Sequence, residues 1–385
     1  MADPSRRTLA ETSRLVIVKV GTRVLTGSDG LLDIARIEAL GRQFEALLAQ
    51  GRRVVLVSSG AVGAGMGRMG LTTRPRELAH LQAVAAIGQS SLIEAYERVF
   101  RGSKRHAAQV LLVADDVHDR ARYLNIRNTL RALLDYGVIP VINENDTVSV
   151  EELRTSFGDN DRLAALVTTL LGADLLVLLS DVDGVFDRHP AEPGAARVPL
   201  VERIDARIEG LARDRLGGLS KGGMASKIAA ARIATEAGAH CVIACGRDDH
   251  VLERLMAAED VGTAFLARAT PLPAWKRWLG WSADPRGTVT VDAGARDAVA
   301  TQGRSLLAAG VRQIEGDFAT GDVVALVAED GREFARGLVN YSEAELRRIA
   351  GLKTERIADE LGYCPYDEVI HRDNLAITRR DHAAG

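Results

Sequence analysis

The sequence of 385 residues predicts an α/β protein with an open, mostly parallel sheet sandwiched by helices, followed by a small β-rich domain. Three observations support this fold class. Short apolar segments recur between residues 15 and 270, helical stretches separate them, and the pattern changes beyond residue 270. Alternating strands and helices favour a layered α/β sheet, whereas short strands with alternating polarity favour a separate β domain.

Six apolar segments are the predicted strands. They span residues 15–20, 53–59, 109–113, 137–143, 174–181 and 240–246. They are rich in valine, leucine and isoleucine and lack polar alternation, which is typical of parallel strands buried on both faces. The helical stretches between them, such as 32–51 and 161–172, end at glycine. Ligands of such folds bind at the carboxyl ends of the strands, so functional residues should follow the apolar segments.

The domain boundaries follow from these patterns. Residues 12–268 form the predicted α/β domain, and residues 269–284 form a linker. The stretch around the linker holds all three tryptophans, which we expect to pack at the domain junction. Residues 285–368 contain short alternating segments with turn residues and form the predicted β-rich domain, followed by a frayed tail.

Composition narrows the function classes. A formal net charge of −3 gives no global electrostatic reason to bind nucleic acid. No apolar run approaches the roughly 20 residues that span a bilayer, and the polar N-terminus has no signal core, so we expect no membrane association. Cys241 and Cys245 lie in a predicted strand, and Cys364 is far from both, which fits a reducing compartment and a cytoplasmic protein.

Two lysines follow patterns that suit phosphate binding. Lys19 lies inside the first apolar strand, just before Gly21, and its ammonium would point toward the strand end. Lys227 lies early in a helix that follows a glycine-rich loop, although no Walker A motif is present. The alternatives are a strand-end lysine that reaches solvent and a loop of solvated lysines.

Polar residues gather after three other strands. The second strand ends in a small-residue turn with Ser59, and the fifth ends in a polar turn with Ser180 and Asp181. A cluster of amides and carboxylates follows the fourth strand: Asn143, Glu144, Asn145, Asp146, Asp159, Asn160 and Asp161. Such groups can hold an ammonium by charge and a carboxylate by amide donors. Ordinary turn and helix-cap chemistry is the alternative.

Other motifs are weak or missing. Gly65, Gly67 and Gly70 match a dinucleotide fingerprint, but they begin several residues after the strand and lack the acidic partner. No ligand spacing indicates a protein-built metal site, and there is no nucleophile elbow.

Six segments together resemble the amino acid kinase family. They are "VKVGTRVLT", "VSSGAVGAG", "YLNIRNTLRALLDYGVIPVINENDTV", "FGDNDRLAALV", "LLSDVDGVFD" and "GGMASKIAAARIA". They occur in that family's order and spacing over about residues 14–260, and "INEND" with "FGDND" resembles the members that phosphorylate glutamate. The segments "VDAGARDAV", "SLLAAGV" and "ARGLVNYS" resemble a PUA domain, a β-rich fold often found in RNA-modifying enzymes.

The resemblance implies an activity. It is the ATP-dependent phosphorylation of the γ-carboxylate of L-glutamate to L-glutamyl 5-phosphate, the first step of proline biosynthesis. The family further implies inhibition by proline, Mg²⁺ held mainly by the ATP phosphates, and a homodimer or homotetramer. An amino acid kinase acting on another substrate and an RNA-binding regulator are the rival hypotheses. Acidic residues interleave with the arginines of the PUA-like segment, which disfavours a strong phosphate-binding stripe but leaves RNA binding open.

The resemblance also assigns residues. Lys19 and Lys227 match catalytic lysines that contact the nucleotide phosphates, and Ser59, Asp146 and Asn160 match glutamate-binding positions. The implied ATP-binding set is Lys19, Ser180, Asp181, Lys221, Gly222, Gly223, Met224, Ala225, Ser226 and Lys227. Ser180 replaces the usual threonine and keeps its hydroxyl, whereas Lys221 stands where threonine is common. The γ-carboxylate of glutamate, with a pKa of about 4.3, is ionised at pH 7, so phosphoryl transfer to it requires no general base.

Overall fold

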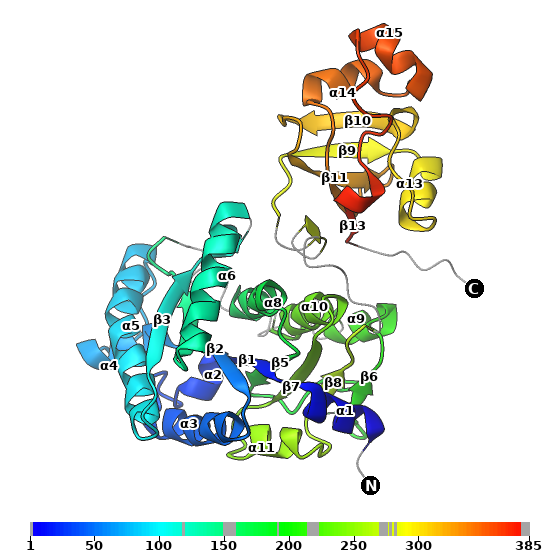
Figure 1. Cartoon of the computed structure of the whole chain (residues 1–385). Helices are drawn as coiled ribbons and strands as arrows, with labels where there is room; N and C mark the ends of the chain where they lie inside the picture. The colour runs from blue at the N-terminus through cyan, green and yellow to red at the C-terminus, as the bar shows by residue number, and fades with distance from the viewer. Residues whose placement is uncertain are drawn as a thin grey trace. The chain divides into compact units, whose positions relative to one another are not determined.

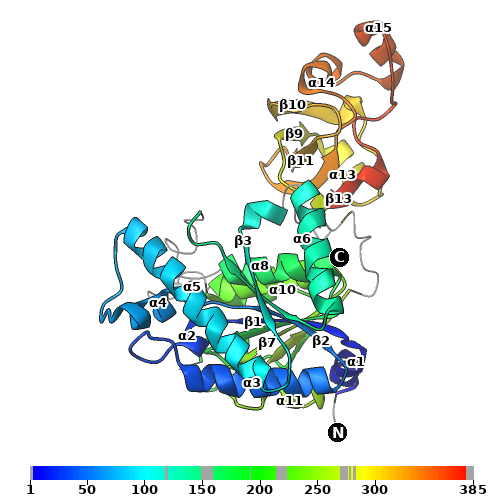
Figure 2. The ribbon, with the colours of Figure 1, turned by 60° about the vertical axis from the view of Figure 1, so that its left-hand side comes forward.

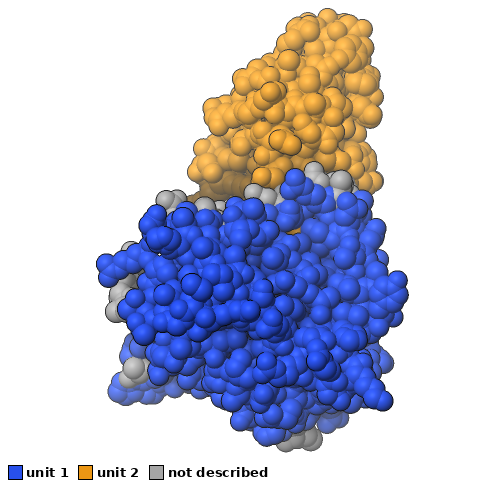
Figure 3. Space-filling view, turned by 90° about the vertical axis from the view of Figure 1, so that its left-hand side faces the viewer, with its two compact units in different colours: residues 1–116, 121–271 blue, residues 117–120, 272–385 orange. Residues whose placement is uncertain are grey.

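A computed structural model gives the fold of the chain. It describes residues 3–117, 120–148, 159–190, 192–213, 223–268, 276, 279–280 and 283–378. The chain divides into two compact units, coloured separately in Figure 3: residues 1–116 with 121–271, and residues 117–120 with 272–385. Trp275, Trp278 and Trp281, which we expected at a domain junction, lie outside the described residues, as does the predicted tail after Thr378.

The first unit is built on an eight-stranded sheet with the order β3-β4-β2-β1-β5-β7-β8-β6. Its strands are β1 (Leu15–Val20), β2 (Arg53–Val57), β3 (Ala107–Leu112), β4 (Ile139–Glu144), β5 (Leu175–Ser180), β6 (Leu200–Val201), β7 (His240–Cys245) and β8 (Thr263–Phe265). The six predicted strands are confirmed, and those between β3 and β7 are all parallel. β8 runs antiparallel to β7 and pairs with β6, two short strands that the apolar pattern did not reveal.

Helices cover both faces of this sheet, as Figures 1 and 2 show. They are α1 (Pro4–Thr12), α2 (Thr22–Leu25), α3 (Ile34–Ala49), α4 (Ala61–Met69), α5 (Leu78–Arg101), α6 (Arg120–Asp135), α8 (Asp159–Leu171), α9 (Ala206–Arg213), α10 (Gly223–Glu236) and α11 (Val251–Met256). In both views α1, α3 and α11 lie on one face, whereas α8 and α10 lie on the other. All residues of β1 and β5, and those of β2 after Arg53, are buried between these layers, as their continuous apolar sequence predicts.

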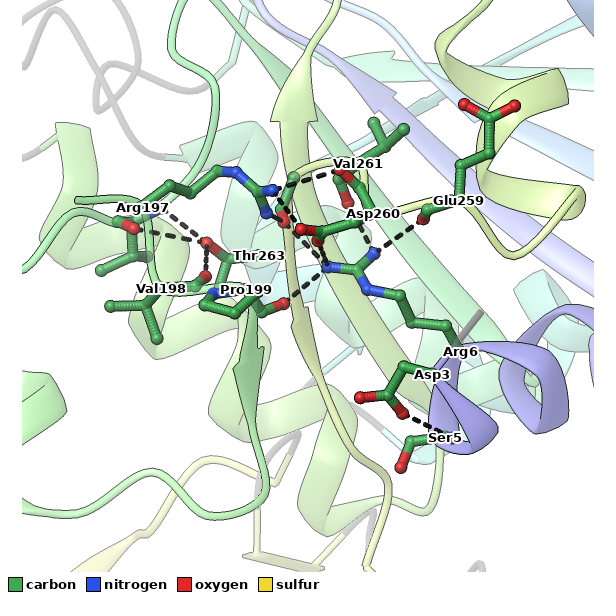
Figure 4. Close-up of polar contacts among 12 residues, drawn as sticks. Asp3, Ser5, Arg6, Arg197, Val198, Pro199, Glu259, Asp260, Val261 and Thr263 are labelled. Carbon is green, nitrogen blue, oxygen red and sulfur yellow. Dashed lines mark hydrogen bonds and ion pairs between the residues drawn. The ribbon is translucent and has the colours of Figure 1, made fainter. Parts of the chain in front are cut away.

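Helix α1 ties the N-terminal segment to the sheet edge, although the predicted α/β domain begins only at residue 12. Arg6 is 5% exposed. Its guanidinium donates to the carbonyls of Glu259 (3.3 Å), Val261 (2.7 Å), Pro199 (2.6 Å) and Gly262 (3.0 Å). It also pairs with Asp260 at 2.9 Å, and Figure 4 shows these contacts converging on one side chain. The arginine therefore joins α1 to segments that lie 193 to 256 residues away in sequence.

The second unit is a five-stranded sheet with the order β10-β9-β11-β12-β13 and its own core. The strands are β9 (Gly287–Val291), β10 (Val311–Gly316), β11 (Val323–Ala328), β12 (Glu333–Leu338) and β13 (Leu375–Ile377), and the helices are α13 (Ala293–Ala300), α14 (Glu343–Ile349) and α15 (Ile357–Leu361). The β-rich character is confirmed. Its last strand lies beyond residue 368, our predicted limit, because a three-residue strand is too short to show a pattern.

Candidate active site

The predicted site residues of the first unit meet at the carboxyl edge of the sheet. Lys19 is the fifth residue of β1 and lies in register between Val57 of β2 and Leu178 of β5. Ser59 follows β2 and Asp146 follows β4, while Ser180 ends β5. β1 pairs with β2 on one side and with β5, which comes much later in the chain, on the other. The strand order therefore reverses at β1, and open α/β sheets bind ligands at such a reversal.

A glycine turn positions Ser59. Gly60 has a φ of +96° and forms the N-cap of α4. An L-residue is strained in this left-handed conformation, so glycine allows the chain to turn from β2 directly into the helix. Ser59 is therefore held at the strand end, 3% exposed, with its hydroxyl directed toward α8 rather than solvent.

Two lysines from distant elements bind one carboxylate. Lys19 Nζ lies 2.8 Å from Asp161 Oδ1, and Lys227 Nζ lies 2.9 Å from Asp161 Oδ2. The side chain of Asp161 is 1% exposed, and those of the two lysines are 8% and 10% exposed. Ser226 Oγ donates to the same carboxylate at 2.9 Å. The predicted catalytic lysines thus lie close together, held by an aspartate to which the sequence assigned no specific role.

The electrostatics of this lysine cluster favour an anionic ligand. Burial opposes the ionisation of Asp161, but the charges of Lys19 and Lys227 outweigh it and lower its pKa to about 2. Burial also lowers the pKa of Lys227, although the charge of Asp161 counteracts it. Two ammonium groups and one carboxylate leave an excess positive charge in a poorly solvated place. A phosphate group brought to this edge would compensate that charge.

Amides and a second carboxylate lie beside the lysine cluster. Asn160 Nδ2 donates to Ser59 Oγ at 3.0 Å and to Asn143 Oδ1 at 3.3 Å. Asp146 is 5% exposed. Burial raises its pKa to about 6, despite a hydrogen bond from Gln89 and the charge of Arg74. The three predicted glutamate-binding residues therefore lie at the same strand ends, two of them in direct contact.

The start of α8 joins these two groups. Asn160 reaches the amides and Ser59, whereas its neighbour Asp161 reaches both lysines. Consecutive residues of a helix point about 100° apart, so one helix end can serve two adjacent sites. A molecule that donates a phosphoryl group at the lysines would therefore lie next to a molecule that receives it at the amides.

Ser180 and Asp181, two of the predicted nucleotide residues, lie at the carboxyl end of β5, the strand that pairs with β1. Ser180 Oγ donates to Asp181 Oδ1 at 3.1 Å, and Arg23 pairs with Asp181 Oδ2 at 2.9 Å. Burial opposes ionisation of Asp181, but hydrogen bonds from Arg23, the backbone and Ser180, with the charge of Arg23, together lower its pKa. Gly223, Met224, Ala225 and Ser226 form the first turn of α10, and Lys221 and Gly222 lie outside the described residues. Their contacts with ATP stay a prediction.

Two residues of the site have weak sequence signals. Asp161 is one of several carboxylates in a polar stretch, and no spacing indicates that it meets both lysines. Gln89 lies mid-helix in α5, where a glutamine is usually solvated, yet it is 7% exposed. The glycines of the weak dinucleotide motif have another use: a Cβ on Gly65 would lie 1.9 Å from the Val84 carbonyl, so this glycine permits α4 and α5 to pack closely.

In the part of the chain that the structure describes, acidic and histidine side chains do not gather into a metal site. Within the described ranges there is no group of three or more His, Cys, Asp or Glu residues that could hold a metal ion. Asp161 and Asp181, two carboxylates at these strand ends, are bound by lysine or arginine. The carboxylates described at these strand ends therefore do not fit a protein-built magnesium site.

Fold and site together define a class: an α/β protein with a buried cluster of two lysines and one aspartate at its strand ends. Residues 14–245 match the amino acid kinase family and residues 287–361 match the PUA domain. The chain belongs to the amino acid kinase family and carries a C-terminal PUA domain.

Curated relatives match almost the whole chain. A glutamate 5-kinase of Rhodopirellula baltica is 46% identical over 372 residues, covering 97% of this chain and 96% of the relative. Glutamate 5-kinases of Syntrophotalea carbinolica and Moorella thermoacetica are each 48% identical, covering 97% of this chain and 100% and 98% of their own lengths. No helix in the described part of the chain has the length and apolar character needed to cross a membrane.

Proposed function

We propose that this kinase transfers the γ-phosphoryl group of ATP to the γ-carboxylate of L-glutamate and forms L-glutamyl 5-phosphate. The observation that carries the proposal is the lysine cluster, in which Lys19 and Lys227 meet at Asp161 beside a buried amide and carboxylate group. The choice of glutamate as acceptor is supported by relatives named glutamate 5-kinase that match nearly the full length of the chain.

Catalysis would rest on charge and alignment. The acceptor carboxylate is ionised at neutral pH and attacks without a general base. Negative charge on the transferred phosphoryl group is stabilised by preorganised cations, and Asp161 holds the two lysines in a fixed arrangement before ATP binds. Asp161 would therefore be a positioning residue, while Lys19 and Lys227 would contact the phosphates.

The acceptor would bind through its α-amino acid group. The ionised carboxylate of Asp146 would pair with the α-ammonium, and Asn160 with Ser59 and backbone amides would hold the α-carboxylate. This arrangement directs the γ-carboxylate toward the lysines, because Asn160 and Asp161 are adjacent on α8. Ser180, Asp181 and the segment from Lys221 to Lys227 would bind ATP. Mg²⁺ would be held mainly by the ATP phosphates and would neutralise part of their charge.

Acyl phosphates can be trapped as hydroxamates, which gives a direct test. Purified protein with ATP, Mg²⁺ and hydroxylamine should form hydroxamate from L-glutamate, and far less from aspartate or N-acetylglutamate. Formation without glutamate, or an equal rate with aspartate, would contradict the assigned acceptor. Added proline should slow the glutamate reaction, since we also propose that proline is a feedback inhibitor of this first step in proline biosynthesis.

Assembly, location and the PUA domain extend the proposal. We expect a homodimer or homotetramer acting in the cytoplasm. Light scattering of the full chain would determine its oligomeric state. RNA binding by the PUA domain is the competing role, and a salt-dependent RNA titration of the full chain would reveal it through a fall in affinity with added salt.

A further inference from the structure

Gln89 lies in the middle of α5 and faces the carboxyl ends of the strands. The residue before it is a close-packing glycine: a Cβ on Gly88 would lie 1.8 Å from the carbonyl oxygen of Ala61 in α4. The absence of a side chain there lets α5 pack directly on α4, the helix that follows Ser59. The helix pair thereby fixes the position of Gln89 relative to the strand ends.

The amide of Gln89 has a partner in every hydrogen-bonding position. Its Oε1 accepts from Asn143 Nδ2 at 3.3 Å and from Gln109 Nε2 at 3.1 Å. Its Nε2 donates to the Glu144 carbonyl at 3.3 Å and to Asp146 Oδ2 at 3.4 Å. A glutamine amide offers two donors and two acceptor positions, so all four are used. If the amide were rotated by 180°, its oxygen would face two acceptors and its nitrogen would face two donors. The four contacts therefore fix its orientation.

These hydrogen bonds link the residues predicted to bind glutamate into one series, in which each side chain donates to the next. Asn160 donates to Ser59 and Asn143, Asn143 donates to Gln89, and Gln89 donates to Asp146. An ionised carboxylate can only accept hydrogen bonds, so Asp146 sets the direction of donation along the chain. Among the described residues Gln89 donates to the Asp146 side chain, through Oδ2 at 3.4 Å.

We propose that Gln89 is a positioning residue for the amino acid acceptor, which orients Asp146 and Asn143 together so that the α-ammonium and α-carboxylate sites have a fixed spacing. The inference rests on the proposed function, because it assumes that Asp146 and Asn160 hold the acceptor. It predicts a residue that does not touch ATP and yet controls acceptor affinity.

The decisive variant is Gln89→Glu, which keeps the shape and removes both donors. A carboxylate at this position would face Asp146 Oδ2 and the Glu144 carbonyl with acceptors only. The KM for glutamate should rise at least tenfold, with the KM for ATP within about twofold of wild type. A second variant, Gln89→Met, removes donors and acceptors without adding charge and should raise the glutamate KM by a smaller factor.

Gln43→Glu is the matched control. Gln43 is 1% exposed in α3. It accepts from the Leu252 amide at 2.9 Å and donates to the Asp248 carbonyl at 3.4 Å, so the same change disturbs a buried amide with a purely structural environment. This control should lower the unfolding temperature without a selective rise in the glutamate KM. Glutamate-dependent thermal stabilisation gives a second readout, expected to be lost in both Gln89 variants while stabilisation by ATP persists.

The outcomes separate this inference from the proposed function. A wild-type protein that forms no hydroxamate from glutamate overturns both. An active wild type whose Gln89→Met variant keeps glutamate KM within twofold overturns the positioning role alone. That role is equally overturned if the Gln89 variants raise both KM values in proportion to lost stability, as expected of a structural residue.

Discussion

Two buried clusters of cations in the first unit differ in how their charge is used. Arg6 donates to four backbone carbonyls and pairs with Asp260, which Arg197 also binds at 2.9 Å. Lys19 and Lys227 share the single carboxylate of Asp161, and in the described structure the Lys19 ammonium has no other ion-pair partner. Among the described residues, Arg6 uses nearly all of its donors on the protein. Lys227 adds only a bond to the Gly223 carbonyl at 3.3 Å, and the two lysines keep an excess of positive charge over Asp161.

The difference separates a structural cation from a functional one. Arginine has five N–H donors in a rigid fork, so four carbonyls and a carboxylate can satisfy it and fix three chain segments together (Figure 4). Each lysine has three donors on a flexible stem, and a shared carboxylate leaves some of them for a ligand. Burial without full pairing costs free energy in the unliganded protein, and a bound phosphate would recover it.

The largest effect should follow from removing one lysine. Lys19→Met or Lys227→Met keeps the apolar stem and removes the ammonium, while Asp161 retains one partner, so the fold should persist. We expect kcat to fall by about 100-fold or more, as expected when a group that stabilises transition-state charge is lost. The KM for glutamate should change only modestly, and steady-state kinetics with varied glutamate and ATP would measure both.

Lys104→Met is the control for the lysine variants. Lys104 is an exposed lysine of the same unit, and its loss should leave kcat unchanged. An unaltered kcat in either buried-lysine variant would remove that lysine from the catalytic assignment.

Arg6→Met should instead lower the stability of the fold and leave the kinetic constants nearly unchanged. The variant leaves four carbonyls and Asp260 without their shared donor, which should destabilise the fold by about 2–4 kcal/mol. Urea unfolding followed by circular dichroism would measure the shift in midpoint. Kinetic constants of the folded fraction should stay near wild type, since Arg6 contacts none of the site residues.

Arg7→Met tests whether charge alone explains that loss. Arg7 lies next to Arg6 on α1 but is exposed, so its removal should change stability by less than about 0.5 kcal/mol. Equal destabilisation by the two variants would mean that the carbonyl contacts of Arg6 contribute little.

The same contrast explains what the sequence could predict. Buried parallel strands have an unmistakable apolar pattern, so the ends of β1 to β5 and β7 were predicted to within two residues. Lys19 stood out because a charge interrupts that pattern. Arg6 did not stand out, because it lies in a short polar N-terminal stretch. Its partners are mainly backbone carbonyls, which every residue type has. Contacts to the main chain leave no compositional trace at the partner positions.

Partners joined through tertiary structure were equally hard to find. Asp161 and Gln89 have functions only because β1, α5, α8 and α10 converge at one sheet edge. The sequence placed amides and carboxylates near the site but could not say which carboxylate meets the lysines and which stays apart. The family resemblance supplied positions such as Asp146 and Asn160, while the role of their supporting residues came from the hydrogen bonds.

Asp146 extends the comparison to a buried anion. The pH dependence of kcat/KM for glutamate that it should cause is the smallest of the expected effects. Burial raises its pKa to about 6, against the hydrogen bond from Gln89 and the charge of Arg74. If its ionised form binds the α-ammonium of glutamate, protonation below pH 6 abolishes that attraction. The kcat/KM for glutamate should therefore fall about tenfold per pH unit below 6, because this ratio reports ionisations of the free enzyme.

Asp146→Asn distinguishes this carboxylate from other groups that titrate in the same range. The γ-carboxylate of glutamate stays ionised until about pH 4.3, but phosphate groups titrate near pH 6 and affect ATP in both proteins. Subtracting the variant's profile removes that shared dependence. The variant should have a low kcat/KM for glutamate without the additional fall below pH 6. A fall of the same size in wild type and variant would show that another group titrates, and that Asp146 is buried for structure, as Arg6 is.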